Sequence, residues 1–291
     1  MQSFKIKNIY LFIILITNIL NAQQSQIKGH ILDLDNNPIQ FAKVGLINFP
    51  TGTVTNINGE FQLSLKNTEY LDSLKISAFN FHDKIIPIKN LLNKSNINIT
   101  LDYSPVDIKE VLISSKTLKT YTEGQEKIKT KKELFFVIPG MDNVNLGAEI
   151  GRKFSLGKKD TKLDEFSFYL KQNNFDNVGF KINIYSIGKN NIPSERLNKE
   201  EIVASINNKT IGWIDVDLSK YHINVNQDII ICIEWIKASE RGDTLSLPIF
   251  APTFFNSTYY YKQSAQSKWR KYTIISTSMK LKYKQRKTFC Q

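Results

Sequence analysis

The sequence predicts an all-β protein that contains two successive β-sandwiches. Three observations support this fold class. Apolar residues recur at every second position in many short runs, which is the periodicity of half-buried strands. Turn residues separate these runs, and aromatic residues make up 11% of the chain, with 12 Tyr and 18 Phe, as is typical of packed β-structure. The 291 residues are enough for about two domains, and the 41% hydrophobic content excludes wholesale disorder.

Residues 1–22 are predicted to be a signal peptide. Lys5 and Lys7 precede an apolar stretch at 9–20 that is too short for the ~20 residues of a membrane-spanning helix. Ala22 and Gln23 flank the expected cleavage site, and the alternative is an uncleaved anchor. We therefore expect export to the periplasm, the outer-membrane periphery or the medium. No transmembrane segment is expected in the mature chain.

Residues 26–101 contain about seven short strands, which suits a small β-sandwich. Apolar and polar residues alternate at 61–65, 74–78 and 97–101, and turn residues stand at 35–38 and 50–52. Asn58-Gly59 between two such runs is the strongest short-range signal for a hairpin.

Two segments of this region resemble the hallmarks of the carboxypeptidase-regulatory-like domain. Residues 27–44 resemble its opening, and residues 52–61 (GTVTNINGEF) resemble its second motif, with Asn56 where the family has Asp. The resemblance covers residues 23–103 and implies a transthyretin-like seven-stranded sandwich without catalytic residues. Such domains are widespread in exported proteins of Bacteroidetes and stand at the front of TonB-dependent receptors, so the resemblance implies a Bacteroidetes protein.

Residues 104–131 are predicted to be an exposed linker. Its first part, 103–113, resembles the segment that often follows the carboxypeptidase-regulatory-like domain, and its second part is polar and rich in Lys and Thr. In receptors a plug and a barrel come next. The rest of this chain is too short for them and lacks a regular series of ten-residue amphipathic strands, so a receptor is not expected.

Residues 132–285 are predicted to form a jelly-roll-like β-sandwich, followed by a tail at 286–291. Alternation returns at 166–170 and 279–283, and the run at 229–236 is apolar on both faces except at Glu234, which indicates a central strand. One short helix is expected within 193–204.

This half also resembles a domain that often follows the first one in Bacteroidetes proteins. The similar segments are 147–151, 180–185, 217–221 and 234–235. The resemblance implies a β-sandwich and no assigned activity.

The sequence predicts no catalytic residue, no metal site and no cofactor. His30, His82 and His222 are the only histidines and lack the spacing of a zinc peptidase. No Gly-x-Ser-x-Gly elbow or phosphate-binding glycine loop is present. Cys232 lies in an apolar run and is expected to be a small buried hydrophobe, while Cys290 is a tail thiol, and the sequence leaves their pairing open.

Acidic residues give a third hypothesis, a hydrolase with an unrecognised site. Neighbours on a strand point to opposite faces, so the pairs at 164–165 and 200–201 do not converge by themselves. Glu234 in its apolar strand needs a partner, so an ion pair or an exposed face is expected there.

The net charge of +12 raises the question of an anionic partner. Nucleic acid is not favoured, because the chain is expected to be exported and carries no known nucleic-acid motif. Lys280, Lys282 and Lys284 share one face of the last strand, and we expect an edge strand protected against aggregation. The alternative is weak contact with an anionic lipid or lipopolysaccharide surface.

The aromatic residues near the C-terminus are the candidate ligand contacts. They are Phe254, Phe255, Tyr259, Tyr260, Tyr261, Trp269 and Tyr272. Rings on sandwich loops stack on sugars or anchor protein partners, whereas alternating rings can instead lie in the core. The sequence thus predicts a non-enzymatic, exported cell-envelope protein that binds a protein or glycan. The second hypothesis is a carbohydrate-binding accessory protein of a polysaccharide-handling system.

Overall fold

The structure is a computed structural model and describes residues 25–92, 94, 96–105, 118–137, 145–251 and 258–286. Within these ranges the chain is almost entirely β-structure, with four 3-10 helices of three residues each, so the all-β prediction is confirmed. None of the helices in the described ranges is long and apolar enough to span a membrane. The predicted signal peptide with its site at Ala22 and Gln23, the residues Phe254 and Phe255, and Cys290 lie outside these ranges.

The first unit packs two sheets face to face. In the described residues one sheet has the order β4-β1-β7 and the other β3-β2-β5-β6. Alternate side chains point inward and form one core, in which Ile31, Val44 and Leu63 are fully buried. The elements are β1 (Ser25–Leu32), β2 (Lys43–Leu46), β3 (Gly52–Val54), β4 (Glu60–Leu65), η1 (Asn67–Glu69), β5 (Ser73–Ser77), β6 (Lys84–Pro87), η2 (Ile88–Asn90) and β7 (Ile97–Thr100).

The turn at Asn58-Gly59 forms, with Gly59 at a φ of 72°, but it does not close the predicted hairpin. The strand before it, β3, pairs with β2, and the strand after it, β4, pairs with β1. The turn therefore carries the chain from one sheet of the sandwich to the other. The Asn-Gly motif therefore determines that the chain turns here, but the packing of the core determines which strands the flanking segments pair with.

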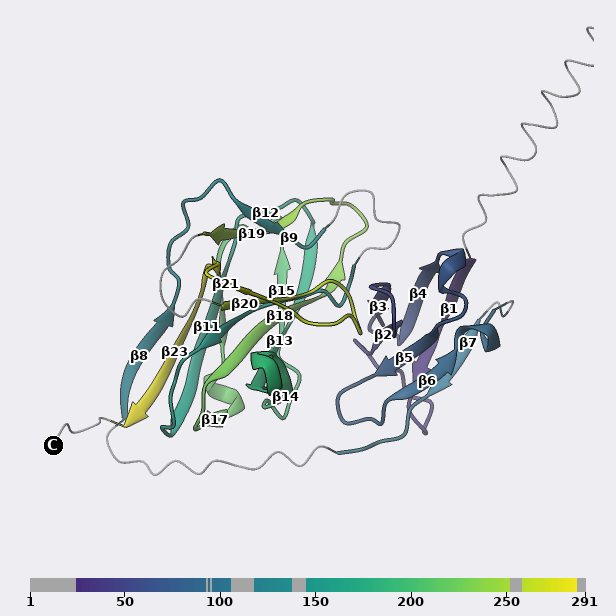
Figure 1. Ribbon diagram of the computed structural model, residues 1–291, viewed down its shortest axis with the longest axis horizontal. Helices are drawn as coiled ribbons and strands as arrows, with labels where there is room; N and C mark the ends of the chain where they lie inside the picture. The colour runs from purple at the N-terminus through teal and green to yellow at the C-terminus, as the bar shows by residue number, and fades with distance from the viewer. Residues whose placement is uncertain are drawn as a thin grey trace, which may run out of the picture.

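The second unit is a larger sandwich (Figure 1). One main sheet has the order β14-β13-β18-β10-β20-β21, with β15 beside β13, and the other has the order β16-β11-β23-β8, with β17 beside β11. A smaller sheet, β12-β19-β22, is joined by β9. Aromatic residues fill the core between the main sheets, with Phe166, Phe168, Phe180 and Trp235 fully buried.

The bounds of the second unit's elements follow in chain order. They are β8 (Leu118–Gly124), β9 (Glu133–Phe135), β10 (Glu149–Phe154), β11 (Thr161–Leu170), β12 (Gln172–Asn173), β13 (Asn177–Ile187), η3 (Lys189–Asn191), β14 (Pro193–Arg196), β15 (Val203–Asn207), β16 (Gly212–Asp217), η4 (Ser219–Tyr221), β17 (Asn224–Val225), β18 (Ile229–Ala238), β19 (Leu245–Phe250), β20 (Thr258–Lys262), β21 (Arg270–Thr273), β22 (Ser276–Thr277) and β23 (Met279–Arg286).

Strand β18 lies between β13 and β10, as the doubly apolar run predicts. The helix expected within 193–204 is wrong, because β14 and the start of β15 occupy that range. Both strands pair with β13, which supplies the hydrogen bonds that a helix would otherwise make internally.

Strand β8 lies within the range predicted to be a linker, 104–131, and pairs with β23 along its whole length. Most of its residues are exposed, so it lacks the alternating apolar pattern of a half-buried strand. Because β8 covers that side, β23 lies between β11 and β8, and the prediction of a lysine-protected edge strand is wrong. Lys284 pairs with Asp164 at 2.9 Å, and the Lys280 ammonium lies 4.7 Å from the centre of the Trp213 ring.

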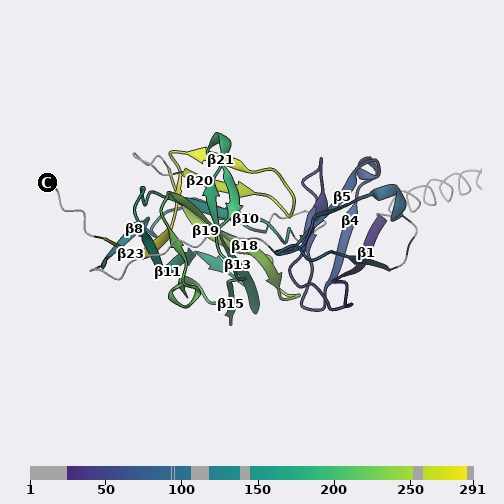
Figure 2. The ribbon, with the colours of Figure 1, turned by 90° about the horizontal axis from the view of Figure 1, so that it is seen from below.

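The two units meet along β2 and β3 (Figure 1), and Figure 2 shows them side by side from below. Gly45 and Gly52 face the turn that follows β20, where a Cβ at Gly45 would lie 2.5 Å from the Ala265 carbonyl oxygen. The Gln266 amide donates a hydrogen bond of 2.6 Å to the Ser77 hydroxyl. The close approach therefore needs glycine at two positions of the first unit.

Candidate functional site

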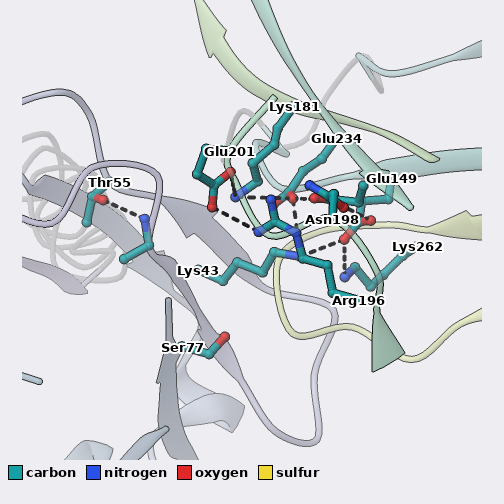
Figure 3. A network of polar contacts seen from close by, with 12 residues as sticks. Lys43, Thr55, Ser77, Glu149, Lys181, Arg196, Asn198, Glu201, Glu234 and Lys262 are labelled. Carbon is teal, nitrogen blue, oxygen red and sulfur yellow. Dashed lines mark hydrogen bonds and ion pairs between the residues drawn. The ribbon is translucent and has the colours of Figure 1, made fainter. Parts of the chain in front are cut away.

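A cluster of charged side chains is buried where the two units meet (Figure 3). Glu149 of β10 and Glu234 of β18 stand opposite each other in register, and both side chains are 0% exposed. Lys43 of β2 reaches across from the first unit. Its Nζ lies 2.7 Å from Glu149 Oε1 and 3.2 Å from Glu234 Oε2.

The second unit supplies the other partners of the two carboxylates. Lys262 pairs with Glu149, and Lys181 lies 3.6 Å from Glu234. The Asn183 amide donates to both carboxylates, at 3.1 and 2.7 Å. Lys181 and Asn183 share one face of β13 because side chains two positions apart on a strand point the same way.

A second set of contacts, around Glu201 and Arg196, also connects this cluster to the first unit. Glu201 pairs with Arg196 at 3.0 Å and lies 3.6 Å from Lys181. The Arg196 guanidinium stacks over the Phe79 ring of the first unit, 4.2 Å from its centre. Charges at this junction therefore bridge the units at two places.

The electrostatics of the cluster oppose acid–base catalysis. Burial acts to raise the pKa of Glu149, but Lys262 and Lys43 outweigh it and hold that pKa well below its usual range. Burial acts to lower the pKa of Lys43, and Glu149 and Glu234 reverse this and raise it well above its usual value. A general acid needs a carboxyl that holds its proton near neutral pH. Glu149 is instead a permanent anion, sealed from substrate.

Cys232 lies beside this cluster and is fully buried among Tyr185, Ile230 and Tyr260, as its apolar run predicts. Burial and the charge of Glu149 raise the pKa of its thiol well above the usual value. The thiolate is the nucleophilic form of cysteine, so this residue is poorly suited to thiol catalysis.

A groove of about 820 Å³ opens between the units beside the charged cluster. Its floor comes from both units, with Phe41 and Val54 from the first and Leu146 and Ile236 from the second. Its volume is within the range of ~300–1,000 Å³ that is usual for ligand sites. This groove, which we call the junction groove, is the candidate ligand site.

The wall of the junction groove is polar and comes mainly from β1 and β4. Along it the Gln62 amide donates to the Gln26 side chain at 3.2 Å, and His30 lies 3.5 Å from Glu60. Ile57, at 63% exposure, also lines the groove. The site thus combines an apolar floor with polar groups able to orient a ligand.

The aromatic residues predicted to contact ligand are largely internal. Tyr259 and Tyr260 are buried, and Tyr259 stacks on Tyr272 with ring centres 4.9 Å apart. Tyr261 is half-buried against the main core, and Trp269 packs on Tyr185 with ring centres 5.9 Å apart.

The burial of these rings agrees with the alternative that the sequence left open, in which alternating rings lie in the core. Tyr259 packs into the main core from one face of β20, and Tyr260 packs with Tyr185 and Cys232 on the other face. Burial raises the pKa of Tyr260 to about 12.

The other candidate residues of the sequence separate in space. Asp164 pairs with Lys284 and Glu201 with Arg196, so neither acidic pair forms a two-carboxylate site. Glu234 has the ion-pair partners that its apolar strand requires. In the described part of the chain no group of three or more His, Cys, Asp or Glu residues is placed to hold a metal ion.

Lys43, Glu149, Lys181 and Lys262 were not predicted from the sequence to be site residues. The signal that marks Glu234, a charge within an apolar strand, also marks Lys181 in the run at 178–184 and Glu149 before Ile150. Lys43 follows the buried Ala42 and carries no comparable signal, because its partners belong to the other unit.

The comparisons with known proteins bear on the first unit. Residues 27–113 match the family model of the CarboxypepD_reg-like domain. No curated protein matches the chain.

Among solved structures, the chain is similar to the cysteine protease and lectin-like domains of Cwp84, a surface layer associated protein of Clostridium difficile. The identity is 10% and the TM-score 0.40, over 80% of this chain and 45% of that one. Two structures of infectious bursal disease virus follow. The Gx strain has 9% identity and a TM-score of 0.24, over 90% of this chain and 65% of that one. The Gt strain has 9% identity and a TM-score of 0.26, over 89% and 63%.

These structural likenesses are too loose to carry an argument about this chain, which spans 45% of the length of the Cwp84 structure. The family match is specific to one region. Residues 27–113 therefore match the CarboxypepD_reg-like domain, a family of non-catalytic β-sandwiches.

Proposed function

We propose that the protein is a non-enzymatic, exported protein of the cell envelope that binds an envelope protein or glycan in the junction groove. The observation that carries this proposal is the shared floor of the groove, with Phe41 and Val54 from one unit and Leu146 and Ile236 from the other. The buried cluster around Lys43 holds the two units beside each other. A surface assembled in advance loses little freedom when a ligand binds, which favours affinity.

The non-catalytic part of the proposal has two supports. The CarboxypepD_reg-like domain family is non-catalytic. The pair of carboxylates that most resembles a hydrolytic centre, Glu149 and Glu234, is fully buried, and each carboxylate is held by ammonium and amide partners. A hydrolase remains the less favoured hypothesis, and turnover abolished by one carboxylate substitution would support it.

A carbohydrate-binding accessory role is the second candidate. The specific observation in its favour is the series of amide side chains along the groove, from Gln26, Gln62, Asn56 and Asn96. Amides both donate and accept hydrogen bonds, as sugar hydroxyls require. Measured affinity for an oligosaccharide, lost on substitution of these amides, would favour this role.

The test of the binding site compares two exposed isoleucines. Ile57 lines the groove at 63% exposure, and Ile274 is 61% exposed and is not among the residues that line it. Cells producing the full chain are fractionated, the envelope fraction is cross-linked, and captured partners are quantified. We expect Ile57→Glu to reduce capture and Ile274→Glu to leave it unchanged, with equal melting temperatures. Equal capture by both variants would exclude the groove.

The proposed export has its own test. Fractionation should place the protein in the periplasm, at the outer-membrane periphery or in the medium, and the intact mass should correspond to a chain that begins at Gln23. A full-length mass that retains Ala22 and the residues before it would refute cleavage at this site.

A further inference from the structure

We infer that the junction groove binds an acidic oligosaccharide, a chain of sugars that carry carboxylates. The inference rests on the proposed function and names the ligand class of the same site. Three features of the groove point to this ligand. They are an aromatic ring in the floor, a wall of amide side chains, and two ammonium groups that pair with no described residue.

The ring in the floor belongs to Phe41, whose backbone has a φ of 55°. This value lies in the left-handed region, which bulky residues rarely adopt. Thr55, which is fully buried, holds the conformation in place. The Phe41 N–H donates to the Thr55 carbonyl at 3.1 Å, and the Thr55 hydroxyl accepts from the Ala42 N–H at 2.8 Å. Backbone strain of this kind concentrates at ligand sites.

Phe41 is half-buried and packs against Val54 of the first unit and Ile236 of the second. The part of the ring that these neighbours leave uncovered lines the groove. An aromatic ring offers a flat apolar face on which the apolar face of a sugar ring can stack. We therefore assign the contact with one sugar ring to Phe41.

The wall of the groove supplies hydrogen-bonding groups in a fixed arrangement. Gln26, Lys28 and His30 of β1 point to the same side, because they stand two positions apart on one strand. Gln62 of β4 stands opposite Lys28, and its amide donates to the Gln26 side chain at 3.2 Å. This bond orders both amides before a ligand arrives. Amides donate and accept hydrogen bonds, and sugar hydroxyls require both.

The charge of the groove favours an acidic sugar over a neutral one. Glu60 is the one carboxylate among the described residues that line the groove, and His30 at 3.5 Å and Asn56 at 2.8 Å already engage it. Lys28 and Lys237 are exposed, and neither forms an ion pair with a described residue. The two lysines belong to different units, so a ligand with carboxylates on more than one sugar can pair with both.

An extended peptide is less well suited to this groove. Such peptides commonly bind by main-chain hydrogen bonds to the edge of a sheet. At Glu60 the edge of β4 is closed, because the Glu60 N–H donates to the Asn56 side chain at 3.0 Å and its carbonyl accepts from the Asn56 N–H at 2.9 Å. The wall therefore offers side-chain amides rather than an open main-chain edge.

Calorimetry with the full mature chain tests the inference. The probes are tetramers of galacturonate, mannuronate, guluronate and glucuronate, each with a neutral twin whose carboxylates are reduced to alcohols. We expect at least one acidic tetramer to bind about tenfold more tightly than its twin, since two exposed ion pairs contribute about that ratio. The difference should shrink as the salt concentration rises.

Substitutions separate the charge from the ring. Lys28→Ala and Lys237→Ala should each weaken binding of the acidic tetramer and leave binding of the neutral twin unchanged. Lys268→Ala, which alters an exposed lysine outside the groove, should change neither. Phe41→Leu keeps an apolar side chain in the floor and removes the ring, so it should weaken both ligands by a similar factor. If this variant fails to fold, the lysine variants and the neutral twins decide the question.

Three results would overturn the inference. They are an absence of binding by every acidic tetramer, equal binding of the tetramers and their twins, and binding of a hexa-aspartate peptide as tight as that of the best tetramer. The capture assay with Ile57→Glu tests the groove independently of ligand class. Failure of the inference is therefore distinguishable from failure of the proposed function.

Discussion

Replacement of Lys43 by methionine tests whether the buried charges join the two units energetically. Methionine keeps much of the side-chain volume and removes the ammonium group that bonds Glu149 at 2.7 Å and Glu234 at 3.2 Å. Loss of one partner from a buried ion pair costs about 3–5 kcal/mol, because the remaining charge stays buried without compensation.

The magnitude expected here is at the lower end of that range. Glu149 retains Lys262, and Glu234 retains Lys181, so neither carboxylate loses its last cation. Asn183 continues to donate to both. We therefore expect the free energy of unfolding to fall by about 3 kcal/mol in Lys43→Met.

Urea unfolding followed by tryptophan fluorescence measures this loss. The three tryptophans of the chain, Trp213, Trp235 and Trp269, all belong to the second unit, whereas Lys43 belongs to the first. A shift of the fluorescence midpoint therefore reports coupling across the junction.

The matched control is Lys75→Met, which removes an ion pair with Asp83 on the surface of the first unit. That pair has a distance of 2.7 Å and side-chain exposures of 34% and 49%, so its loss should cost less than about 1 kcal/mol. If Lys43→Met shifts the transition no more than this control does, the units are not coupled by the cluster and the reasoning is wrong.

The remaining predictions concern protonation, packing and close approach. Burial acts to raise the pKa of Glu149, but the neighbouring ammonium groups hold this pKa below the unfolded value of about 4.3. The stability that ionised Glu149 contributes is therefore complete above that pH and is lost as the pH falls toward the folded-state pKa. In a profile of melting temperature against pH, Glu149→Gln should therefore reduce the fall in melting temperature at acidic pH. Tyr260→Ala should lower the free energy of unfolding by about 3–5 kcal/mol in a urea titration, since the ring is 1% exposed, and a fully stable variant would contradict its burial. Gly52→Val should loosen the contact between the units without unfolding either, because the Cβ of the valine would collide with the Ala265 carbonyl. We expect faster protease cleavage between the units with unchanged circular dichroism. An unchanged cleavage rate would contradict this prediction.

The strands that the sequence predicts well are those with one face in a core. Residues 166–170 and 279–283 alternate because β11 and β23 each bury one side against the aromatic core. Strand β8 escaped prediction because most of its residues are exposed and its stability comes from the pairing with β23. Pairing between distant segments leaves no local pattern in the sequence.

The candidate site was likewise only partly predictable from the sequence. A charge in an apolar strand identifies Glu234 as a residue that needs a partner, but the partner, Lys43, is chosen by the docking of two units. The groove depends on that docking as well, since Val54 and Ile236 become its floor only when the units meet. The tyrosines of β20 kept two interpretations, because ring density in a sequence does not distinguish a binding platform from a strand covered on both faces.

Because Cys232 is buried, the labelling of its thiol can report how fast the surrounding structure opens. Its thiol lies beneath Tyr185 and Tyr260, close to the carboxylate of Glu149, and is 0% exposed. In a chain whose Cys290 is replaced by serine, Cys232 is the sole thiol, and a thiol-specific reagent can modify it only during transient opening of the surrounding structure. At high reagent concentration the labelling rate equals the rate at which the surrounding structure opens. A ligand that spans both units would therefore be detected by slower labelling of the Cys232 thiol, although it does not contact that thiol.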